Sequence, residues 1–259
     1  MNKKYKCLDL FCGGGGAAKG YHDAGFEVTG IDIEKRNYPY EFMQADVMYI
    51  LECEEFVKEF DFIHASPPCQ HYSKLKNLST NKAAWEERHP DLIAPVREKL
   101  KYYNEKHGIP YIIENVEGAP LTSPIKLYGS QFPNMFTQRP RLFESNLNLK
   151  APDVPKTNMK TGKLNTISPT GTVTICGNQP LKGLTSEQTR LYYAIAIGGD
   201  CSWMTLEELT QCIPPCYTKH LGLQVIDYLM GNDHINEEQN FNMDEFVLLV
   251  KKYLKDEWD

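Results

Sequence analysis

Cys69 combines the most reactive type of side chain in this sequence with the most constrained backbone setting. It lies in His64-Ala-Ser-Pro-Pro-Cys-Gln70, directly after an apolar run that predicts a strand. The two prolines fix φ and stiffen the turn, so the next side chain is held in a defined direction. A thiolate is the strongest nucleophile among side chains, and Cys69 is therefore a candidate nucleophile. The alternative is a small buried packing residue, which is the common role of cysteine.

A carboxyl group and two arginines follow in two further segments. Glu114 lies in Ile112-Ile-Glu-Asn-Val116, at the end of a predicted strand, where it can hold or deliver a proton while a thiolate attacks. Arg139 and Arg141 lie in Gln138-Arg-Pro-Arg-Leu142. On an extended strand both would point to the same side, which suits an anion or an electron-rich base edge. An isolated arginine pair of this kind is more often surface decoration.

The segment Leu8-Asp-Leu-Phe-Cys-Gly-Gly-Gly-Gly16 precedes a helix-compatible stretch. Glycines at a strand-to-helix turn let the backbone approach a ligand and leave helix N-terminal amides free. Asp32 ends the next predicted strand, about 20 residues later, where an acidic group can bind ribose hydroxyls. The pattern predicts a nucleotide-like cofactor, although the glycines do not form G-x-G-x-x-G, which counts against NAD. A glycine turn required only for tight packing is the alternative.

The elements that must position these residues alternate between short apolar runs and longer helix-compatible stretches. This alternation predicts βαβ units, and hence an α/β fold with a doubly wound, mostly parallel sheet. The expected strands are Lys6–Phe11, Val28–Ile33, Phe60–Ala65 and Tyr111–Glu114. The expected helices between them are Ala17–Ala24, Val47–Glu59 and Asp91–His107.

The second half of the chain has a different amino-acid composition. Residues 146–183 are rich in Pro, Thr, Asn, Lys and Gly with little periodicity, which predicts a small loop-rich insert. We therefore expect residues 1–145 and 184–259 to form one domain that this insert interrupts. The helices expected after the insert are Thr185–Ile197, Thr205–Cys212, Leu221–Met230 and a final helix that begins near Asn242.

Composition limits the classes of protein to consider. At 259 residues and 41% apolar, the chain can form one substantial core, and no apolar run is long enough for a membrane span. The strand pattern begins by Tyr5 and leaves no room for a signal peptide, and eight cysteines fit a reducing, cytoplasmic setting. The net charge of −6 is unfavourable for binding DNA, but residues 138–190 carry eight basic and three acidic residues. That region could face phosphates, or it is an ordinary solvated surface.

Together, these segments resemble the cytosine-C5 DNA methyltransferase family. The family's D-L-F-C/A-G-x-G-G, P-C-Q, E-N-V and Q-x-R-x-R motifs occur here in the same order. They stand as Asp9–Gly16, Pro68-Cys69-Gln70, Glu114-Asn115-Val116 and a slightly departing Gln138–Arg141. The resemblance covers about residues 5–145 and resumes at Met204–Gly222. The family's closing G-N-x-V motif is absent as such, and Tyr217-Thr218 stands at its place.

The resemblance implies a sheet of the S-adenosylmethionine-dependent methyltransferase type and a specific chemistry. The target cytosine is flipped out of duplex DNA, and Cys69 attacks carbon 6 to form a covalent adduct. Glu114 holds the N3 and amino edge, Arg141 holds the O2 side, and Arg139 belongs to the same catalytic set. Carbon 5 then takes the methyl group of S-adenosyl-L-methionine, which leaves as S-adenosyl-L-homocysteine, and the thiolate departs after the C5 proton is removed.

The same resemblance assigns the remaining site residues. Cofactor contacts are implied for Asp9, Phe11, Gly13, Gly15, Asp32 (the ribose), Ile33 (the adenine face), Asp46 (the adenine amino group) and Pro68. Substrate contacts are implied for Gln70, Ser73 and Asn115, and no metal is expected. The insert takes the place of the target-recognition region. The partner expected is double-stranded DNA, with no membrane and no obligatory protein partner, in the cytoplasm of a bacterial or phage-infected cell. The compact form is similar to that of bacteriophage modification enzymes.

Four alternatives stay open. Ser66-Pro67-Pro68 matches the start of the motif of amino-methyltransferases that act on adenine N6 or cytosine N4, but that chemistry needs no thiolate. An RNA cytosine-C5 methyltransferase would use the same residues, and a non-catalytic binding module would not need an intact Cys69. Cys201, Cys212, Cys216 and His220 would form a zinc site only if Pro214 and Pro215 permit a helix there, which we do not expect.

Overall fold

The computed structural model describes residues 4–69, 90–153, 159, 163–177 and 179–231. Within them, seven strands form one sheet in the order β3-β2-β1-β4-β5-β7-β6. The first five run parallel: β1 (Lys6–Leu10), β2 (Glu27–Asp32), β3 (Glu41–Gln44), β4 (Phe62–Ala65) and β5 (Tyr111–Asn115). Strand β7 (Arg141–Ser145) runs antiparallel to both β5 and β6 (Ile125–Leu127). The doubly wound, mostly parallel sheet is confirmed.

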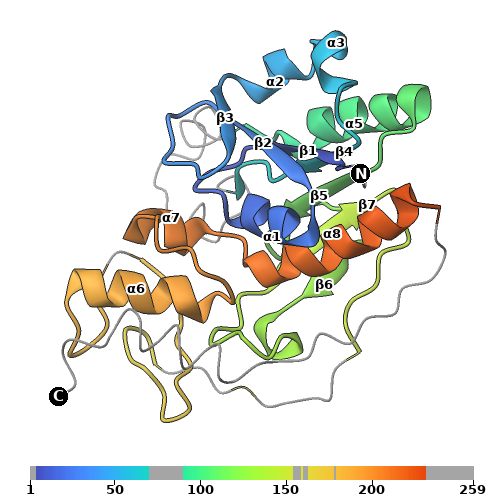
Figure 1. Cartoon of the computed structure of the whole chain (residues 1–259). Helices are drawn as coiled ribbons and strands as arrows, with labels where there is room; N and C mark the ends of the chain where they lie inside the picture. Colours follow the sequence, from blue (N-terminus) through green and yellow to red (C-terminus); the bar gives the residue numbers. More distant parts are fainter. Residues whose placement is uncertain (1–3, 70–89, 154–158, 160–162, 178, 232–259) are drawn as a thin grey trace.

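Helices cover both faces of this sheet (Figure 1). One face lies against α1 (Gly16–Ala24) and α8 (Pro215–Leu229), and the other against α2 (Val47–Ile50), α3 (Glu54–Val57) and α5 (Ile93–His107). Because side chains alternate along a strand, Cys7, Val28 and Phe62 enter the first core and Leu8, Ile31 and Ile63 the second. Strands buried on both faces are continuous apolar runs, which is why the sequence revealed them.

The 3₁₀ helix η3 (Gly129–Gln131) is flanked by Leu127 and Phe132 of the first core. A third hydrophobic cluster lies outside these two cores. It joins α6 (Ser186–Ala196) and α7 (Leu206–Gln211) to Val173, Ile175 and Leu181 of the insert. The insert thus shares a core with the helices that follow it. The domain division at residues 183 and 184 stays a prediction.

The structure differs from the sequence expectations at several elements. The single helix expected over Val47–Glu59 is two short helices, α2 and α3. Leu51 and Phe60 are both buried in the same core, and a straight helix would place residues nine apart on opposite sides. Strand β3 is an exposed edge strand without apolar alternation, and the sequence did not predict it. The final helix expected near Asn242 lies outside the described residues.

Helix α8 begins six residues before the expected Leu221, at Pro215. Our expectation that Pro214 and Pro215 exclude a helix over Cys216 and His220 was wrong. Pro215 occupies the first helical position, where its missing N–H would have no intrahelical partner. Across the described ranges, no group of three His, Cys, Asp or Glu side chains is arranged to hold a metal ion. None of the described helices is long and apolar enough to cross a membrane.

Glycine permits the close approach of α1 and α8. A Cβ on Gly20 would lie 2.0 Å from Thr218 Oγ1 and 2.1 Å from the Pro215 carbonyl oxygen. We expect Gly20→Ala to lower the free energy of unfolding by about 3 kcal/mol, because the helices must separate to admit the methyl group. Urea denaturation measures this.

Gly222→Ala in the same interface is the matched control, since its Cβ would lie 3.0 Å from Ala24 Cβ and Tyr21 Cδ1. Its loss should be clearly smaller. Equal stability of the Gly20→Ala variant and the parent protein would contradict the packing described.

Candidate active site

The predicted site residues that the structure describes come from segments that meet at one edge of the sheet. The glycine turn follows β1, Asp32 ends β2, the Pro67-Pro68-Cys69 turn follows β4, and Glu114 lies near the end of β5. Parallel register places these strand ends side by side, with Leu10 beside Ile31 and Ala65, and Ala65 beside Ile113. The strand order reverses between β1 and β4, where open α/β sheets bind ligands. Gln70 and Ser73, predicted as substrate contacts, lie outside the described residues.

Hydrogen bonds from two sides hold the turn that carries Cys69. Asn115 Nδ2 donates to the Pro67 carbonyl oxygen (2.9 Å), and Asn115 Oδ1 accepts from the Val116 amide (2.9 Å). Ser66 Oγ donates to the Phe11 carbonyl oxygen in the glycine turn (3.3 Å). Asn115 is buried, so its side chain spans from the end of β5 to the nucleophile turn. In this structure the Asn115 side chain bonds the turn that carries Cys69, and its role as a substrate contact stays a prediction.

Removing the Asn115 side chain should loosen the nucleophile turn. We expect Asn115→Ala to cost about 1–3 kcal/mol of stability, because the buried Pro67 carbonyl loses its donor. Alkylation of Cys69, followed by peptide mass spectrometry, should become faster as the turn opens. Asn104→Ala is the matched control, since Asn104 Nδ2 also donates to a backbone carbonyl, that of Ile109, at 3.2 Å. If Cys69 is alkylated at the same rate in both variants, Asn115 does not hold the turn.

The buried Glu114 pairs with the partly buried Arg141 beside the thiol. Antiparallel register sets Glu114 opposite Phe143, so Arg141, two residues before Phe143, lies on the same face of the sheet. Arg141 Nε lies 3.0 Å from Glu114 Oε1. Burial raises the pKa of Glu114 to about 7, against the opposing effect of Arg141 and then Arg139. A carboxyl group with this pKa can give or hold a proton near neutral pH.

The half-buried Cys69 thiol is sensitive to the same charges. Burial raises its pKa above the ordinary value, the negative charge of Glu114 raises it further, and the positive charge of Arg141 opposes both. Protonation of Glu114 would therefore make the Cys69 thiolate easier to form. The two groups act as a charge-coupled pair.

The two arginines do not share a strand face, and this prediction was wrong. Arg139 has φ 32°, in the left-handed region, and it precedes β7, which begins at Arg141. Its Nε donates to the Cys212 carbonyl oxygen and its second guanidinium nitrogen to that of Thr210, both at 2.7 Å. Burial lowers its pKa to about 10, with the nearby Arg141 charge as the second cause. Arg139 thus anchors its loop to the end of α7, while Arg141 faces Glu114.

A hollow of about 290 Å³ lies beside the arginines. Its lining residues are Thr137, Gln138, Arg139, Pro140, Arg141, Thr174 and Ile175. Thr174 and Ile175 belong to the insert, and the sequence analysis missed them because a Thr-rich loop carries no chemical signal. The hollow joins the insert to the Gln138–Arg141 loop.

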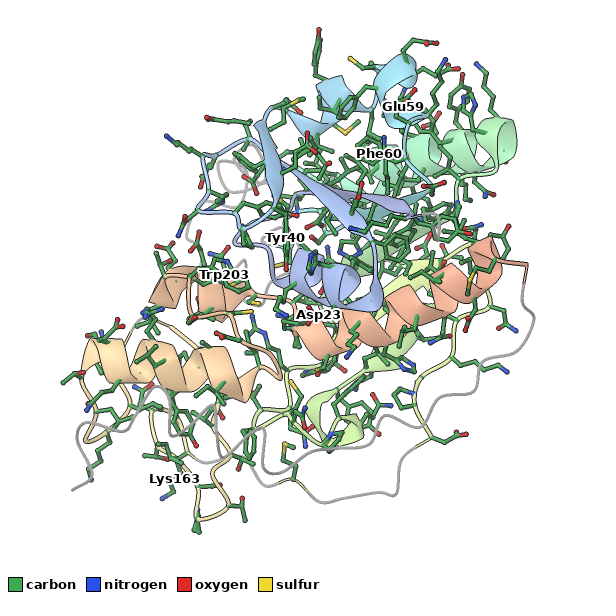
Figure 2. The ribbon with its side chains drawn as sticks, in the orientation of Figure 1. Asp23, Tyr40, Glu59, Phe60, Lys163 and Trp203 are labelled. Carbon is green, nitrogen blue, oxygen red and sulfur yellow. The ribbon has the colours of Figure 1, made fainter. Side chains whose placement is uncertain are left out.

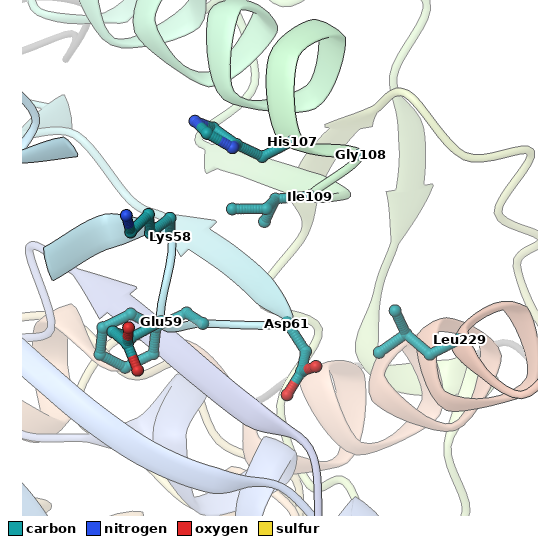
Figure 3. A pocket seen from close by; sticks show the side chains of 8 residues that line it. Lys58, Glu59, Asp61, His107, Gly108, Ile109 and Leu229 are labelled. Carbon is teal, nitrogen blue, oxygen red and sulfur yellow. The ribbon is translucent and has the colours of Figure 1, made fainter. Parts of the chain in front are cut away.

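A second hollow, of about 410 Å³, lies at the opposite end of the strands. Figure 3 shows its lining by Lys58, Glu59, Asp61, His107, Gly108, Ile109 and Leu229. None of the predicted site residues is among them. We therefore assign the candidate site to the carboxyl edge.

The four glycines of the turn have different surroundings. A Cβ on Gly13 would meet nothing within 4 Å, whereas one on Gly16 would lie 2.2 Å from Cys212 Sγ. One on Gly14 would lie 3.1 Å from Glu208 Cβ, and one on Gly15 3.0 Å from the Tyr38 ring. The backbone is thus open at Gly13 and tightly packed at Gly14 and Gly15, and packing requires glycine at Gly16. The packing interpretation thus holds at Gly16, and the cofactor interpretation stays a prediction for the open Gly13.

The remaining cofactor candidates surround that open face. Asp32 accepts from the Gly13 amide (2.9 Å) through Oδ2 and from the Glu34 amide (2.9 Å) through Oδ1. Ile33 is 66% exposed, which makes it an apolar surface available to a planar ring. Asp46 is exposed and caps α2 by accepting from the Met48 amide. Phe11 has φ 58° at the bend of the turn, and Pro68 is exposed beside Cys69.

A buried polar row lies beneath this edge. Asp9 and His64 are register partners on β1 and β4, and both are fully buried. Tyr38 donates to Asp9 Oδ2 (3.1 Å), and the Tyr21 hydroxyl lies 2.9 Å from His64 Nδ1. Burial raises the pKa of Asp9 to about 7, opposed by the Tyr38 hydrogen bond, and lowers that of His64 to about 3. Within the described part of the chain, Asp9 Oδ1 and His64 Nε2 lack hydrogen-bond partners. Asp9 therefore lies under the glycine turn and not at its surface.

Comparisons with known proteins give one family. Residues 5–123 match the C-5 cytosine-specific DNA methylase family. The chain is 29% identical over 124 residues to the Type II methyltransferase M.HindV of Haemophilus influenzae, which covers 43% of this chain and 38% of that protein. The chain thus matches well under half of that relative's length.

Among the solved structures that this chain resembles, two cover most of its length. The S. pombe Dnmt2 methyltransferase superposes with a TM-score of 0.57 at 14% identity, covering 90% of this chain and 100% of that one. The Entamoeba histolytica methyltransferase EhMeth has a TM-score of 0.47 at 13% identity, covering 89% and 99%. At 14% identity, the likeness to the Dnmt2 structure shows the fold alone.

Proposed function

We propose that the protein is a DNA (cytosine-5-)-methyltransferase, because residues 5–123 match the C-5 cytosine-specific DNA methylase family. It transfers a methyl group from S-adenosyl-L-methionine to carbon 5 of a flipped-out cytosine, through a covalent adduct with Cys69. The observation that carries the proposal is the Glu114–Arg141 pair, which lies on β5 and β7 beside Cys69 at the carboxyl edge of the parallel strands.

The residues of this edge support each step of that chemistry. The Cys69 thiolate adds to carbon 6, and Glu114, whose pKa is about 7, gives a proton to the N3 edge. The Arg141 guanidinium stabilises negative charge on the O2 side. The bound cofactor supplies an electrophilic methyl group to carbon 5. Loss of the C5 proton to a base then restores the ring double bond as the Cys69–carbon bond breaks, and N3 returns its proton to Glu114.

The cofactor fits the open face of the glycine turn. Gly13 leaves room for close approach, and Asp32 is held at the adjacent end of β2, in reach of ribose hydroxyls. The exposed Ile33 would cover the adenine face, and Asp46 lies further along the same edge. Phe11, Gly15, Asp9 and Pro68 complete the proposed cofactor set, with Asp9 supporting the turn from below.

Double-stranded DNA is the proposed substrate, with the insert as its recognition region. Thr174 and Ile175 place that region against Arg139 and Arg141, in the hollow of about 290 Å³. Gln70 and Ser73 stay proposed substrate contacts. We place the enzyme in the cytoplasm of a bacterial or phage-infected cell, where it protects or modifies DNA.

Nucleoside mass spectrometry tests the proposal. Purified protein is incubated with S-adenosyl-L-methionine and either unmodified duplex DNA or RNA, and the digested nucleosides are analysed. We expect 5-methylcytosine in DNA. The modified base in RNA alone would keep the C5 chemistry but change the substrate. N4-methylcytosine or N6-methyladenine would overturn the role of Cys69, and unchanged nucleosides in both samples would favour a binding module.

A further inference from the structure

The segment from Trp203 to Cys212, which contains α7, contacts both halves of the candidate site. At its start, Trp203 Nε1 donates to the Gly14 carbonyl oxygen in the glycine turn (2.9 Å). At its end, the Thr210 and Cys212 carbonyls accept from Arg139. Figure 2 shows Trp203 between α7 and the beginning of α1. Residues 189 positions apart are thus joined directly.

We propose that Trp203 is a positioning residue for cofactor binding, which holds the glycine turn in its binding conformation. The inference rests on the proposed function, because it concerns the same cofactor site. It goes beyond that function by assigning to the second half of the chain a part in cofactor affinity.

The glycine turn needs external support. Phe11, Gly13 and Gly15 all have positive φ, and a non-glycine residue there carries strain that persists only when its surroundings hold it. The Gly14 carbonyl and the Gly15 amide belong to one peptide plane. The Trp203 indole donates to the Gly14 carbonyl oxygen of this plane, and the Gly15 amide of the same plane donates to the Cys12 carbonyl oxygen (3.0 Å). The orientation of the plane next to the open Gly13 is therefore fixed from both ends.

Trp203 is itself held in place. Asn37 Nδ2 donates to its carbonyl oxygen (3.3 Å), and the next residues, Met204 and Glu208, would contact a Cβ on Gly14 at 3.2 and 3.1 Å. Thr205 caps α7, accepting from the Glu208 amide while its own amide donates to Glu208 Oε2. The indole thus extends from a capped helix start and not from a free loop, so it can impose a geometry on the turn.

Trp203→Phe tests the inference, because it removes the indole donor and keeps an aromatic ring. Titration calorimetry with S-adenosyl-L-homocysteine, at a temperature where both proteins are folded, should show an affinity lower by about fivefold. Tyr5→Phe is the matched control: it removes one hydroxyl donor to a backbone carbonyl, that of Leu229, far from the turn. Its affinity should equal that of the parent protein.

Indole emission gives a second readout that lost stability alone would not change. The emission of the parent protein minus that of Trp203→Phe reports Trp203. Addition of S-adenosyl-L-homocysteine should shift this difference emission. Unchanged affinity in Trp203→Phe, or no shift in that difference emission, would overturn the inference while leaving the proposed function intact. If the parent protein binds no S-adenosyl compound, the proposed function fails and the inference fails with it.

Discussion

Cys69→Ala should lower methyl transfer by at least about 10⁴-fold, the scale expected when a covalent nucleophile is removed. Without the sulfur there is no addition to carbon 6, and carbon 5 stays too poor a nucleophile to take the methyl group. The side chain is half-buried and lies on a turn that Asn115 and Ser66 hold, so alanine should not disturb the fold. Methyl incorporation into duplex DNA measures the loss, and calorimetry should show unchanged cofactor affinity.

Cys53→Ala is the matched control, since Cys53 is also partly buried but precedes α3, away from the carboxyl edge. Its activity should equal that of the parent protein. An oligonucleotide with 5-fluorocytosine tests the adduct itself: fluorine on carbon 5 cannot leave as a proton does, so the Cys69–carbon 6 bond should persist on a denaturing gel. Activity retained in Cys69→Ala would remove the covalent mechanism and favour an amino-methyltransferase.

The sequence predicted the gathering of Cys69 and Glu114 correctly because parallel strands impose it. Both residues lie at or just after the carboxyl end of a strand that is buried on both faces, and such strands are continuous apolar runs. Right-handed crossovers then bring these ends to one edge. The exposed strand β3 has no such pattern, because its side chains face solvent and its pairing with β2 alone defines it.

The contacts that were missed or wrong depend on residues distant in the sequence. Arg139, whose φ is left-handed, binds the Cys212 carbonyl, 73 residues away. Trp203 meets Gly14 across 189 residues. His64 stood inside the nucleophile motif, but only the fold brings Tyr21 to its ring. Local periodicity carries no information about such pairs.

Glu114→Gln should lower methyl transfer by about 10²–10⁴-fold, because the amide cannot give a proton to the ring. In the parent protein, activity that needs protonated Glu114 should fall as the pH rises through about 7. The residual activity of the variant should lack that fall. A pH–rate profile of kcat for both proteins measures the difference.

The same substitution should raise stability at high pH, which separates a functional carboxyl from a structural one. The folded-state pKa of Glu114 is raised from its ordinary value of 4.5 to about 7, so its contribution to stability is fully present below 4.5 and lost as the pH rises through about 7. Glutamine stays neutral throughout. The variant should therefore match the parent protein near pH 4.5 and exceed it by about 3 kcal/mol above pH 8 in urea denaturation.

The neighbouring groups set the background for this measurement. Burial also raises the pKa of Asp9 to about 7, so Asp9 lowers the stability of both proteins over the same pH range. The free energy of unfolding of Glu114→Gln should therefore still fall as the pH rises, but less than that of the parent protein. The pKa of His64 is lowered to about 3, so its contribution is present above 6.5 and lost as the pH falls toward 3, again in both proteins. Only the difference between the two curves belongs to Glu114.

Glu144→Gln is the matched control, because Glu144 is a buried glutamate held by Arg97 through bonds of 2.6 and 2.7 Å. Glu144→Gln weakens that ion pair, so it should lower the free energy of unfolding at high pH, whereas Glu114→Gln should raise it. If Glu114→Gln is also destabilising above pH 8, the Arg141 pair outweighs the burial of the Glu114 charge. Glu114 would then be ionised at neutral pH, and it could not be the proton donor of the reaction.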